Sequence, residues 1–225
     1  MKLLGTGTDA KTVKGEKYGY MTGILYLAPY KESGVANVCP NASAGCIASC
    51  LYTAGRGAMS NVQRARIAKT VLFKTDNATF MQTLEKDIVS LIVKATKKQL
   101  TPCVRLNGTS DIPWENTGIM QTFPNIQFYD YTKSFSRMME YLNGTMPSNY
   151  HLTFSRDEEN NDRADAVLAD GGNVAIVFNT MPTEYKGFTV LDGDLSDLRF
   201  GDAKNCVVGL KAKGKAKKDT SGFVV

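Results

Sequence analysis

The feature that most constrains the fold is a series of short apolar runs that recur at an almost constant interval. They read PCVRLN, IQFYDY, YHLTFS, NVAIVF, FTVLD and CVVGLK. Residues near the centres of the first four, Arg105, Tyr129, Thr153 and Ile176, are 24, 24 and 23 residues apart. That interval fits a strand followed by a short returning helix. The sequence therefore predicts βα units of a parallel sheet or barrel.

The segments around these runs complete the predicted secondary structure. The apolar stretch 21–29 predicts a first strand that ends at Pro29. Apolar residues at spacings of three and four predict helices over about 61–73 and 78–98, the second with Asp76 or Asn77 as its N-cap. Three shorter helices are expected in the gaps between strands, at about 117–123, 134–142 and 162–169, and the last two strands leave little room for full helices.

No linker interrupts the 225 residues, so the sequence predicts one domain. Its parts are a lead and first strand (1–37), a cysteine loop (38–57), two helices (58–100), βα units (101–210) and a basic tail (211–225). Neither a signal peptide nor an apolar run of about 18 residues is found, which predicts a cytoplasmic protein without a membrane partner. If a phage encodes the chain, the compartment is the host cytoplasm.

Three of the five cysteines, Cys39, Cys46 and Cys50, fall within twelve residues of a loop rich in small side chains. In a reducing cytoplasm such a cluster favours metal or redox chemistry over disulfides. Three thiolates could bind three irons of a [4Fe–4S] cluster. Zinc is the alternative, although structural zinc normally has four protein ligands. Cys103 and Cys206 lie in apolar runs and are expected in the core.

Polar segments follow the predicted strands, among them NGTSDIPWE, DYTKS and SRDEEN. Ligands of parallel α/β proteins bind at the carboxyl ends of the strands, so these segments predict an active-site rim. Ordinary polar loops are the alternative. In this rim Lys133 is a candidate acid/base residue or carboxylate clamp, and a solvated lysine is equally compatible with its position.

Two resemblances sharpen these expectations. The segments CPNASAGCIASCLYTAGRG, RLNGTSDIPWE, FYDYTKS and GLKAKGKAKKDTSGFVV are similar to the phage family called gene product eighty-eight, over nearly the whole chain. A cysteine loop after a first strand, followed by about six strands, more distantly resembles radical S-adenosylmethionine enzymes. That resemblance implies a partial (β/α) barrel of about six parallel strands. The spacing here, Cys-x6-Cys-x3-Cys, is wider than the usual Cys-x3-Cys-x2-Cys of those enzymes.

The second resemblance also implies site residues. Cys39, Cys46 and Cys50 match the cluster ligands, and Asp111 matches a residue that accepts hydrogen bonds from the ammonium group of S-adenosylmethionine. The remaining cofactor-binding candidates share a position at predicted strand ends: Asn107, Gly108, Thr109, Ser110, Tyr131, Thr132, Ser155 and Arg156. Lys133 and Asp111 are the candidate catalytic residues.

The last part of the chain is strongly basic. Five lysines fall within eight residues: Lys211, Lys213, Lys215, Lys217 and Lys218. Ammonium groups at this density could bind phosphates in a salt-sensitive, sequence-independent way, and a solubilising end is the alternative. The nearby Asp192, Asp194 and Asp197 do not match a calcium loop and are expected to bind substrate or to pair with the lysines. His151 is expected to be structural.

Two functions from different classes follow. The first is an iron–sulfur enzyme of the radical S-adenosylmethionine type acting on an unidentified substrate, with nucleic acid or a nucleotide among the candidates. The second is a non-enzymatic phage accessory protein that binds a host macromolecule or nucleic acid, its cysteine loop holding zinc or no metal.

Overall fold

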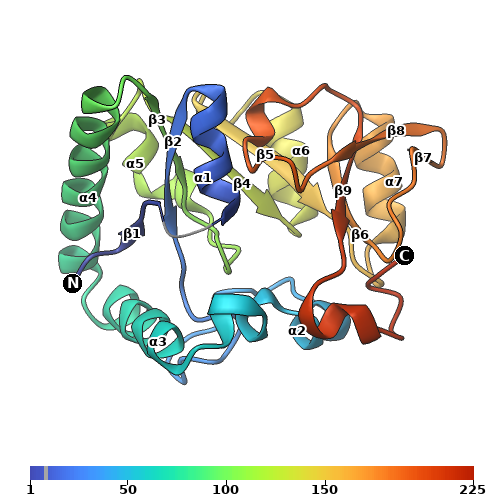
Figure 1. Ribbon diagram of the computed structural model, residues 1–225, viewed down its shortest axis with the longest axis horizontal. Helices are drawn as coiled ribbons and strands as arrows, with labels where there is room; N and C mark the ends of the chain where they lie inside the picture. The colour runs from blue at the N-terminus through green and yellow to red at the C-terminus, as the bar shows by residue number, and fades with distance from the viewer. Residues whose placement is uncertain (8–9) are drawn as a thin grey trace.

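A computed structural model describes residues 1–7 and 10–225. Its centre is a nine-stranded sheet in the order β1-β2-β3-β4-β5-β6-β9-β8-β7 (Figure 1). All neighbours pair in parallel except the two edge pairs, β1 with β2 and β7 with β8, which are antiparallel. The strands are β1 (Leu4–Gly5), β2 (Tyr20–Leu25), β3 (Thr101–Arg105), β4 (Gln127–Thr132), β5 (Tyr150–Ser155), β6 (Val174–Phe178), β7 (Glu184–Tyr185), β8 (Phe188–Asp192) and β9 (Val207–Lys211).

The helices connect and cover these strands. The α-helices are α1 (Ala10–Lys14), α2 (Ala44–Ala48), α3 (Ser60–Thr75), α4 (Asn77–Lys97), α5 (Ile119–Thr122), α6 (Phe135–Leu142) and α7 (Asn161–Ala169). Short 3-10 helices are η1 (Gly15–Tyr18), η2 (Leu51–Thr53), η3 (Gly55–Ala58), η4 (Trp114–Thr117), η5 (Arg199–Gly201) and η6 (Gly214–Lys218). In Figure 1, α1 lies in front of the sheet, and α2, α3 and η6 lie along its lower edge.

The main core lies between the sheet and its crossover helices. Helix α4 buries a stripe at spacings of three and four, and Asp76 caps it by accepting a hydrogen bond from the backbone N–H of Thr79. The stripe packs with alternate residues of the strands, because successive strand side chains point to opposite faces. The buried residues of α4 are Phe80, Leu84, Ile88, Leu91 and Ala95.

The connection between β8 and β9 covers the other face. Strand β9 lies between β6 and β8, so the chain passes the position of β9 and then returns to it. A right-handed crossover in the reverse direction must run over the opposite face of the sheet. Accordingly, Leu198 packs against Cys103 and Tyr129, and the ring of Phe200 makes an edge contact with Tyr20.

The prediction of a mixed α/β fold with a mostly parallel sheet is confirmed. Within the described residues seven strands run parallel instead of about six, because β2, the predicted first strand, pairs in parallel with β3 beside the six predicted runs. Within the described residues the sheet is open, with β1 and β7 as its edges. The predicted first strand is shorter than expected and ends at Leu25, so Pro29 lies in the following loop. The described residues contain no helix long and apolar enough to span a bilayer.

Candidate functional site

The cysteine loop leaves the carboxyl end of β2 and runs along the lower edge of the sheet (Figure 1). Cys39 fixes its first part: its Sγ accepts a hydrogen bond from the backbone N–H of Tyr30 at 3.3 Å and donates one to the carbonyl oxygen of Thr109 at 3.5 Å. The cysteine loop and the segment after β3 are therefore in direct contact, as expected for loops at the same edge of a parallel sheet.

Cys46 lies in α2, whose start is held by a residue far along the chain. Ser43 caps the helix by accepting from the N–H of Cys46, and its own hydroxyl donates to Glu158 at 2.9 Å. The N–H of Gly45 donates to the same carboxylate at 2.6 Å. A Cβ at Gly45 would contact the side-chain oxygens of Glu158 and Ser221, so a larger residue here would displace those side chains. Cys50 follows as the residue before η2.

Burial raises the pKa of all three thiols: that of Cys39 to about 12, that of Cys46 to about 11, and that of Cys50 above its ordinary value. The negative charges of the neighbouring thiolates add to the effect, with Cys46 and Cys50 acting on Cys39. Lys133 opposes it at Cys46. The raised pKa values keep the three thiols protonated at neutral pH, so a metal would have to displace their protons.

The arrangement of the thiols is not that of an assembled metal centre. Within residues 1–7 and 10–225, no three His, Cys, Asp or Glu side chains lie close enough together to hold one ion. All five cysteines are free thiols. Cys46 also packs against an apolar cluster formed by the last part of the chain, Ala212, Ala216, Phe223 and Val224. The set Cys39, Cys46 and Cys50 thus remains a prediction as a ligand set.

Asn107 organises the rim segment 107–111. Its Oδ1 accepts hydrogen bonds from the Ser110 hydroxyl, the Ile112 N–H and the Trp114 indole N–H. Its backbone N–H donates to the buried carboxylate of Asp130 at 2.7 Å. The hydroxyl of Thr109 donates to the Leu27 carbonyl at 2.6 Å. The polar groups of this segment therefore shape the loop itself.

Gly108 has a steric role in the same segment. A Cβ there would lie 2.6 Å from the Leu25 carbonyl oxygen and from the Tyr26 ring, so only glycine allows the segment after β3 to approach the end of β2.

Asp111 lies at the centre of a buried charge network. Its Oδ1 accepts from Thr132 Oγ1 and from Arg137 Nη1, and its Oδ2 accepts from the backbone N–H of Lys133. Arg137 also forms a two-pronged pair with Glu115, at 2.7 and 2.8 Å. Both carboxylate oxygens of Asp111, which was predicted to accept hydrogen bonds from an ammonium group of the cofactor, thus accept hydrogen bonds from donors of the protein itself.

Lys133 points along the strand ends towards β5. Its Nζ lies 3.1 Å from Ser155 Oγ, 3.2 Å from the Arg156 carbonyl oxygen and 3.3 Å from an oxygen of Asp157. Only 10% of the lysine side chain is exposed, which differs from a solvated loop lysine. The ammonium group also lies 5.4 Å from the centre of the Phe223 ring.

Arg156 holds the C-terminus against the rim. Its Nη1 donates to the carbonyl oxygens of Gly222 and Phe223 at 2.6 and 3.0 Å. The last residues then pair with the end of β6, because Val224 forms a parallel bridge with Val177 and Val225 exchanges backbone hydrogen bonds with Val177 and Asn179. The predicted basic tail is therefore folded onto the site.

Tyr131 differs from the other predicted residues because its side chain belongs to the face covered by the β8–β9 connection. The Arg105 guanidinium lies 4.7 Å from its ring centre and pairs with the buried Asp197 at 2.8 Å. The Tyr131 hydroxyl is buried without a hydrogen-bond partner. Burial raises its pKa to about 12, so it remains neutral.

Sequence reasoning missed several residues that build the rim. Arg137, Glu115, Glu158 and Asp157 all lie in or beside the polar segments that were singled out, but their partners are distant in the chain. The local sequence carries no signal for them: Arg137, for example, is buried in α6 although it lies off the apolar positions of that helix.

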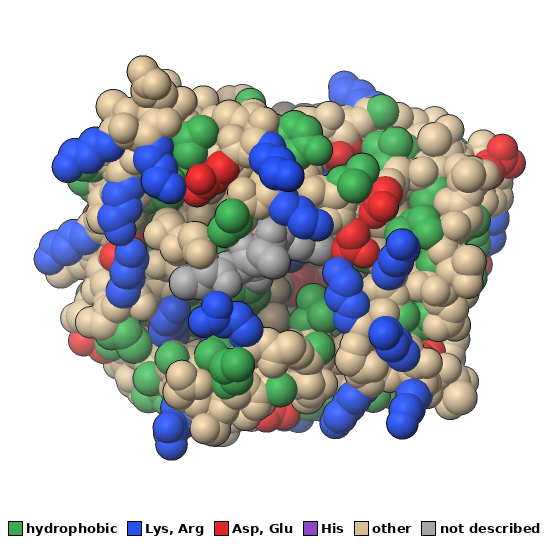
Figure 2. Space-filling view, in the orientation of Figure 1, with side chains coloured by type: hydrophobic (Ala, Val, Ile, Leu, Met, Phe, Trp, Pro, Cys, Tyr) green, Lys and Arg blue, Asp and Glu red, His purple; other side chains and the backbone are tan. Residues whose placement is uncertain are grey.

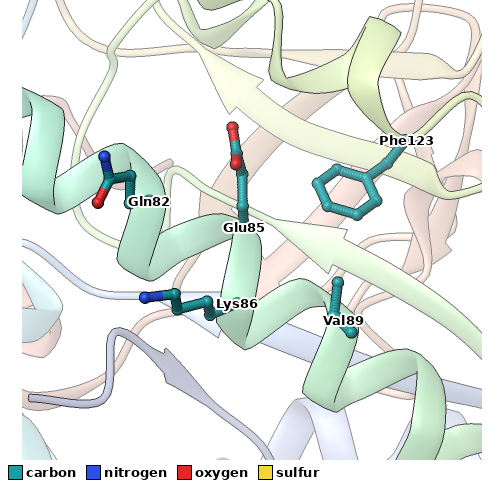
Figure 3. A pocket seen from close by; sticks show the side chains of 5 residues that line it. All are labelled: Gln82, Glu85, Lys86, Val89 and Phe123. Atoms are coloured by element: carbon teal, nitrogen blue, oxygen red, sulfur yellow. The ribbon is translucent and has the colours of Figure 1, made fainter.

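The pocket shown in Figure 3 lies apart from these residues. It has a volume of about 400 Å³ and is lined by Gln82, Glu85, Lys86 and Val89 of α4 and by Phe123. None of the predicted site residues lines it.

The five predicted lysines are all exposed, whereas the alanines between them, Ala212 and Ala216, are buried. Figure 2 shows basic side chains gathered over the lower right of the molecule, the region where η6 lies in Figure 1. The expected pairing of an acidic residue with the lysines is confirmed by Asp194, whose Oδ1 lies 2.7 Å from Lys213 Nζ.

Comparison with known proteins identifies one family. A family model described as Gene product 88 matches residues 2–225, which is nearly the whole chain and agrees with the predicted phage family. No curated protein and no solved structure matches the chain. The likeness to radical S-adenosylmethionine enzymes receives no support from these comparisons.

Proposed function

We propose that this protein, which belongs to the Gene product 88 family, is a thiolate-ligated iron–sulfur protein and an enzyme of the radical S-adenosylmethionine type. The proposal takes the open sheet as a partial (β/α) barrel with the metal centre at its carboxyl edge. Cys39, Cys46 and Cys50 are the proposed ligands of a [4Fe–4S] cluster, and S-adenosylmethionine is the proposed cofactor.

One observation carries the proposal. Three partly buried thiols lie on one loop at the edge where parallel sheets bind ligands, and Cys39 and Cys46 both lie in the electrostatic field of Cys50. Two features of the surroundings suit the loss of their protons. The ammonium group of Lys133 lowers the pKa of Cys46, and the Arg66 guanidinium lowers that of Cys50, each against the larger effect of burial. Thiolates are the normal ligands of such clusters.

The side chains as they stand do not form a ready ligand group, so metal binding requires the loop to close around the ion. The elements that would have to move are short: α2 has five residues, and two 3-10 turns follow it. The hydrogen bonds of Ser43 and Gly45 to Glu158 hold the start of α2 and would have to adjust.

The test is anaerobic expression with iron and sulfide, followed by iron and sulfide assay and visible spectroscopy. We expect a coloured protein whose iron is lost in Cys39→Ser, Cys46→Ser and Cys50→Ser. Cys103→Ser and Cys206→Ser are matched controls, because these buried thiols lie in other clusters of the core and should keep the iron. Cleavage of S-adenosylmethionine by the reduced protein tests the cofactor separately. A colourless, iron-free protein after reconstitution would eliminate the proposal, and bound zinc would favour the zinc alternative.

A second candidate function is favoured by the lysines. A folded segment presents all five ammonium groups to solvent while its alanines anchor it to the cysteine loop, an arrangement suited to a phosphate backbone. In this function the protein binds nucleic acid without catalysing a reaction. A salt-dependent gel shift with single-stranded DNA, unchanged by removal of metal, is the expected result. Absence of any shift at low salt would exclude it.

A further inference from the structure

A second pocket opens at the carboxyl ends of β6, β8 and β9. Its volume is about 530 Å³. Its lining includes one residue just after each strand or at its end: Asn179 after β6, Asp194 after β8 and Lys211 at the end of β9. Lys14 of α1 closes one side, and Ala212, Lys213 and Lys217 complete the lining.

The topology makes this a favourable place for a ligand. The connection that leaves β6 passes the position of β9 and leads to β8, whereas the connection that leaves β8 leads back to β9. Loops that leave neighbouring strands in opposite directions leave a crevice between them. In open α/β sheets ligands bind in such crevices, at the carboxyl ends of the strands.

The charge of the lining selects an anion. Among the described lining residues, four lysines face one aspartate, an excess of three positive charges. The aspartate also has an organising role: Asp194 accepts from Lys213 Nζ and from the backbone N–H of Lys211, and its carbonyl oxygen accepts from Lys14 Nζ at 2.7 Å. Asp194 is therefore hydrogen-bonded to three of the four lysines, through two side chains and one backbone N–H. An anion would relieve the remaining repulsion among the ammonium groups.

The type of cation and the rest of the lining narrow the class of anion. Lysine binds phosphate as a point charge, and several ammonium groups close together favour a ligand that carries several negative charges, as a polyphosphate does. Among the described residues of the lining, Ala212 is the only apolar one and none is aromatic, so these residues offer no ring on which a base could stack. The volume falls within the range of roughly 300–1,000 Å³ typical of small-molecule sites.

We propose that this pocket binds the phosphate groups of a small polyphosphorylated molecule of nucleotide size, recognised through its phosphates and not through a base. The site is separate from the cysteine loop, and the inference does not depend on a metal centre. It also differs from the nucleic-acid function, because it needs Lys14 and only those basic-segment lysines that line the pocket.

The lysines of the basic segment provide a matched comparison. Lys211 and Lys217 line the pocket, whereas Lys215 and Lys218 are equally exposed on the same segment and do not. We would titrate the full-length protein with inorganic tripolyphosphate and with a single-stranded oligothymidylate by calorimetry, at low and at physiological salt. The proteins compared are the wild type, the double variants Lys211→Ala/Lys217→Ala and Lys215→Ala/Lys218→Ala, and the single variant Lys14→Ala.

We expect tripolyphosphate to bind the wild type and to bind the Lys211→Ala/Lys217→Ala protein about tenfold or more weakly, as the loss of two close charges predicts. Lys14→Ala should weaken it as well, and Lys215→Ala/Lys218→Ala should change it by less than about twofold. Equal losses in both double variants would overturn the pocket in favour of a dispersed basic surface. Binding of the oligonucleotide alone, or no binding of tripolyphosphate at low salt, would also overturn it. Circular dichroism of each variant distinguishes lost binding from lost folding.

Discussion

Arg137 Nη1 lies 2.6 Å from Oδ1 of Asp111, and the two side chains are only 9% and 10% exposed. The pair joins α6 to the loop after β3 and thus connects two βα units at the rim. A buried pair of this kind is expensive to break, because removal of one partner leaves an uncompensated charge away from water.

We therefore expect Asp111→Ala to lower the free energy of unfolding by about 3 kcal/mol, the lower end for a buried pair, because Arg137 keeps its contact with Glu115. Urea denaturation measures the change. Asp165→Ala is the control: it breaks the pair with Lys186, in which both side chains are 46% exposed, and should cost less than about 1 kcal/mol. Equal losses in the two variants would show that the rim pair is not buried in solution.

Arg156 provides a prediction for the C-terminus. Its guanidinium holds the carbonyl groups of Gly222 and Phe223, so Arg156→Ala should release the last residues from the rim. We expect the backbone amide of Val225, which donates to Val177, to exchange its hydrogen about tenfold faster or more. Hydrogen exchange followed by mass spectrometry measures this. Lys215→Ala is the control, in which the exchange rate should not change. Unchanged protection in Arg156→Ala would mean that the bridge to β6 is sufficient to hold the C-terminus.

The raised pKa values of the thiols predict slow alkylation of the metal-free protein. Because the thiolate is the reactive species, a pKa of about 12 for Cys39 and about 11 for Cys46 leaves little of it near neutral pH. We expect iodoacetamide to modify both residues at least about tenfold more slowly than it modifies glutathione near pH 7.5, and faster as the pH rises. Mass spectrometry of the labelled peptides gives both rates. Labelling as fast as that of glutathione would contradict the burial of these sulfurs.

His151 predicts a dependence of stability on pH. Burial, and then the charge of Arg199, lower its pKa to about 4 from an ordinary value of 6.5. Between these two values the unfolded chain binds more protons than the native protein. The free energy of unfolding therefore rises with pH across this window, and the same amount of stability is lost as the pH falls through it. The full change across the window is about 3–4 kcal/mol, from a pKa difference of about 2.5 units at about 1.4 kcal/mol per unit.

Replacing this histidine removes the titrating group. In His151→Gln the rise of stability between about pH 4 and pH 6.5 should be shallower than in the wild type. Urea midpoints across that range measure the slope for each protein. Parallel slopes would assign the acid sensitivity to other groups.

Much of the fold followed from local patterns. The helices α3, α4, α6 and α7 lie close to the predicted ranges, because apolar spacing and capping act over a few residues. The spacing of the apolar runs also predicted the parallel strands β3 to β6. The position of β9 between β6 and β8 was not predictable in this way, since it depends on which of two short strands pairs with β6.

The candidate site was predictable only in part. The polar segments after the strands do meet at one edge, and Cys39 touches the segment after β3. Their roles were not readable from the sequence. Asn107, Asp111 and Lys133 look like ligand-binding residues in the chain, yet in the fold their polar atoms bind the protein's own groups.

The sequence by itself determined where strands and helices form, that thiols and polar residues follow the strands, and that the C-terminus is basic. These properties depend on the spacing and type of neighbouring residues. Only the tertiary structure decided which charges meet: Glu158 reaches Gly45 across 113 residues, and Asp194 reaches Lys213 only because β8 lies beside β9. Contacts of this kind depend on the order of strands in the sheet, and short-range interactions along the chain carry no information about that order.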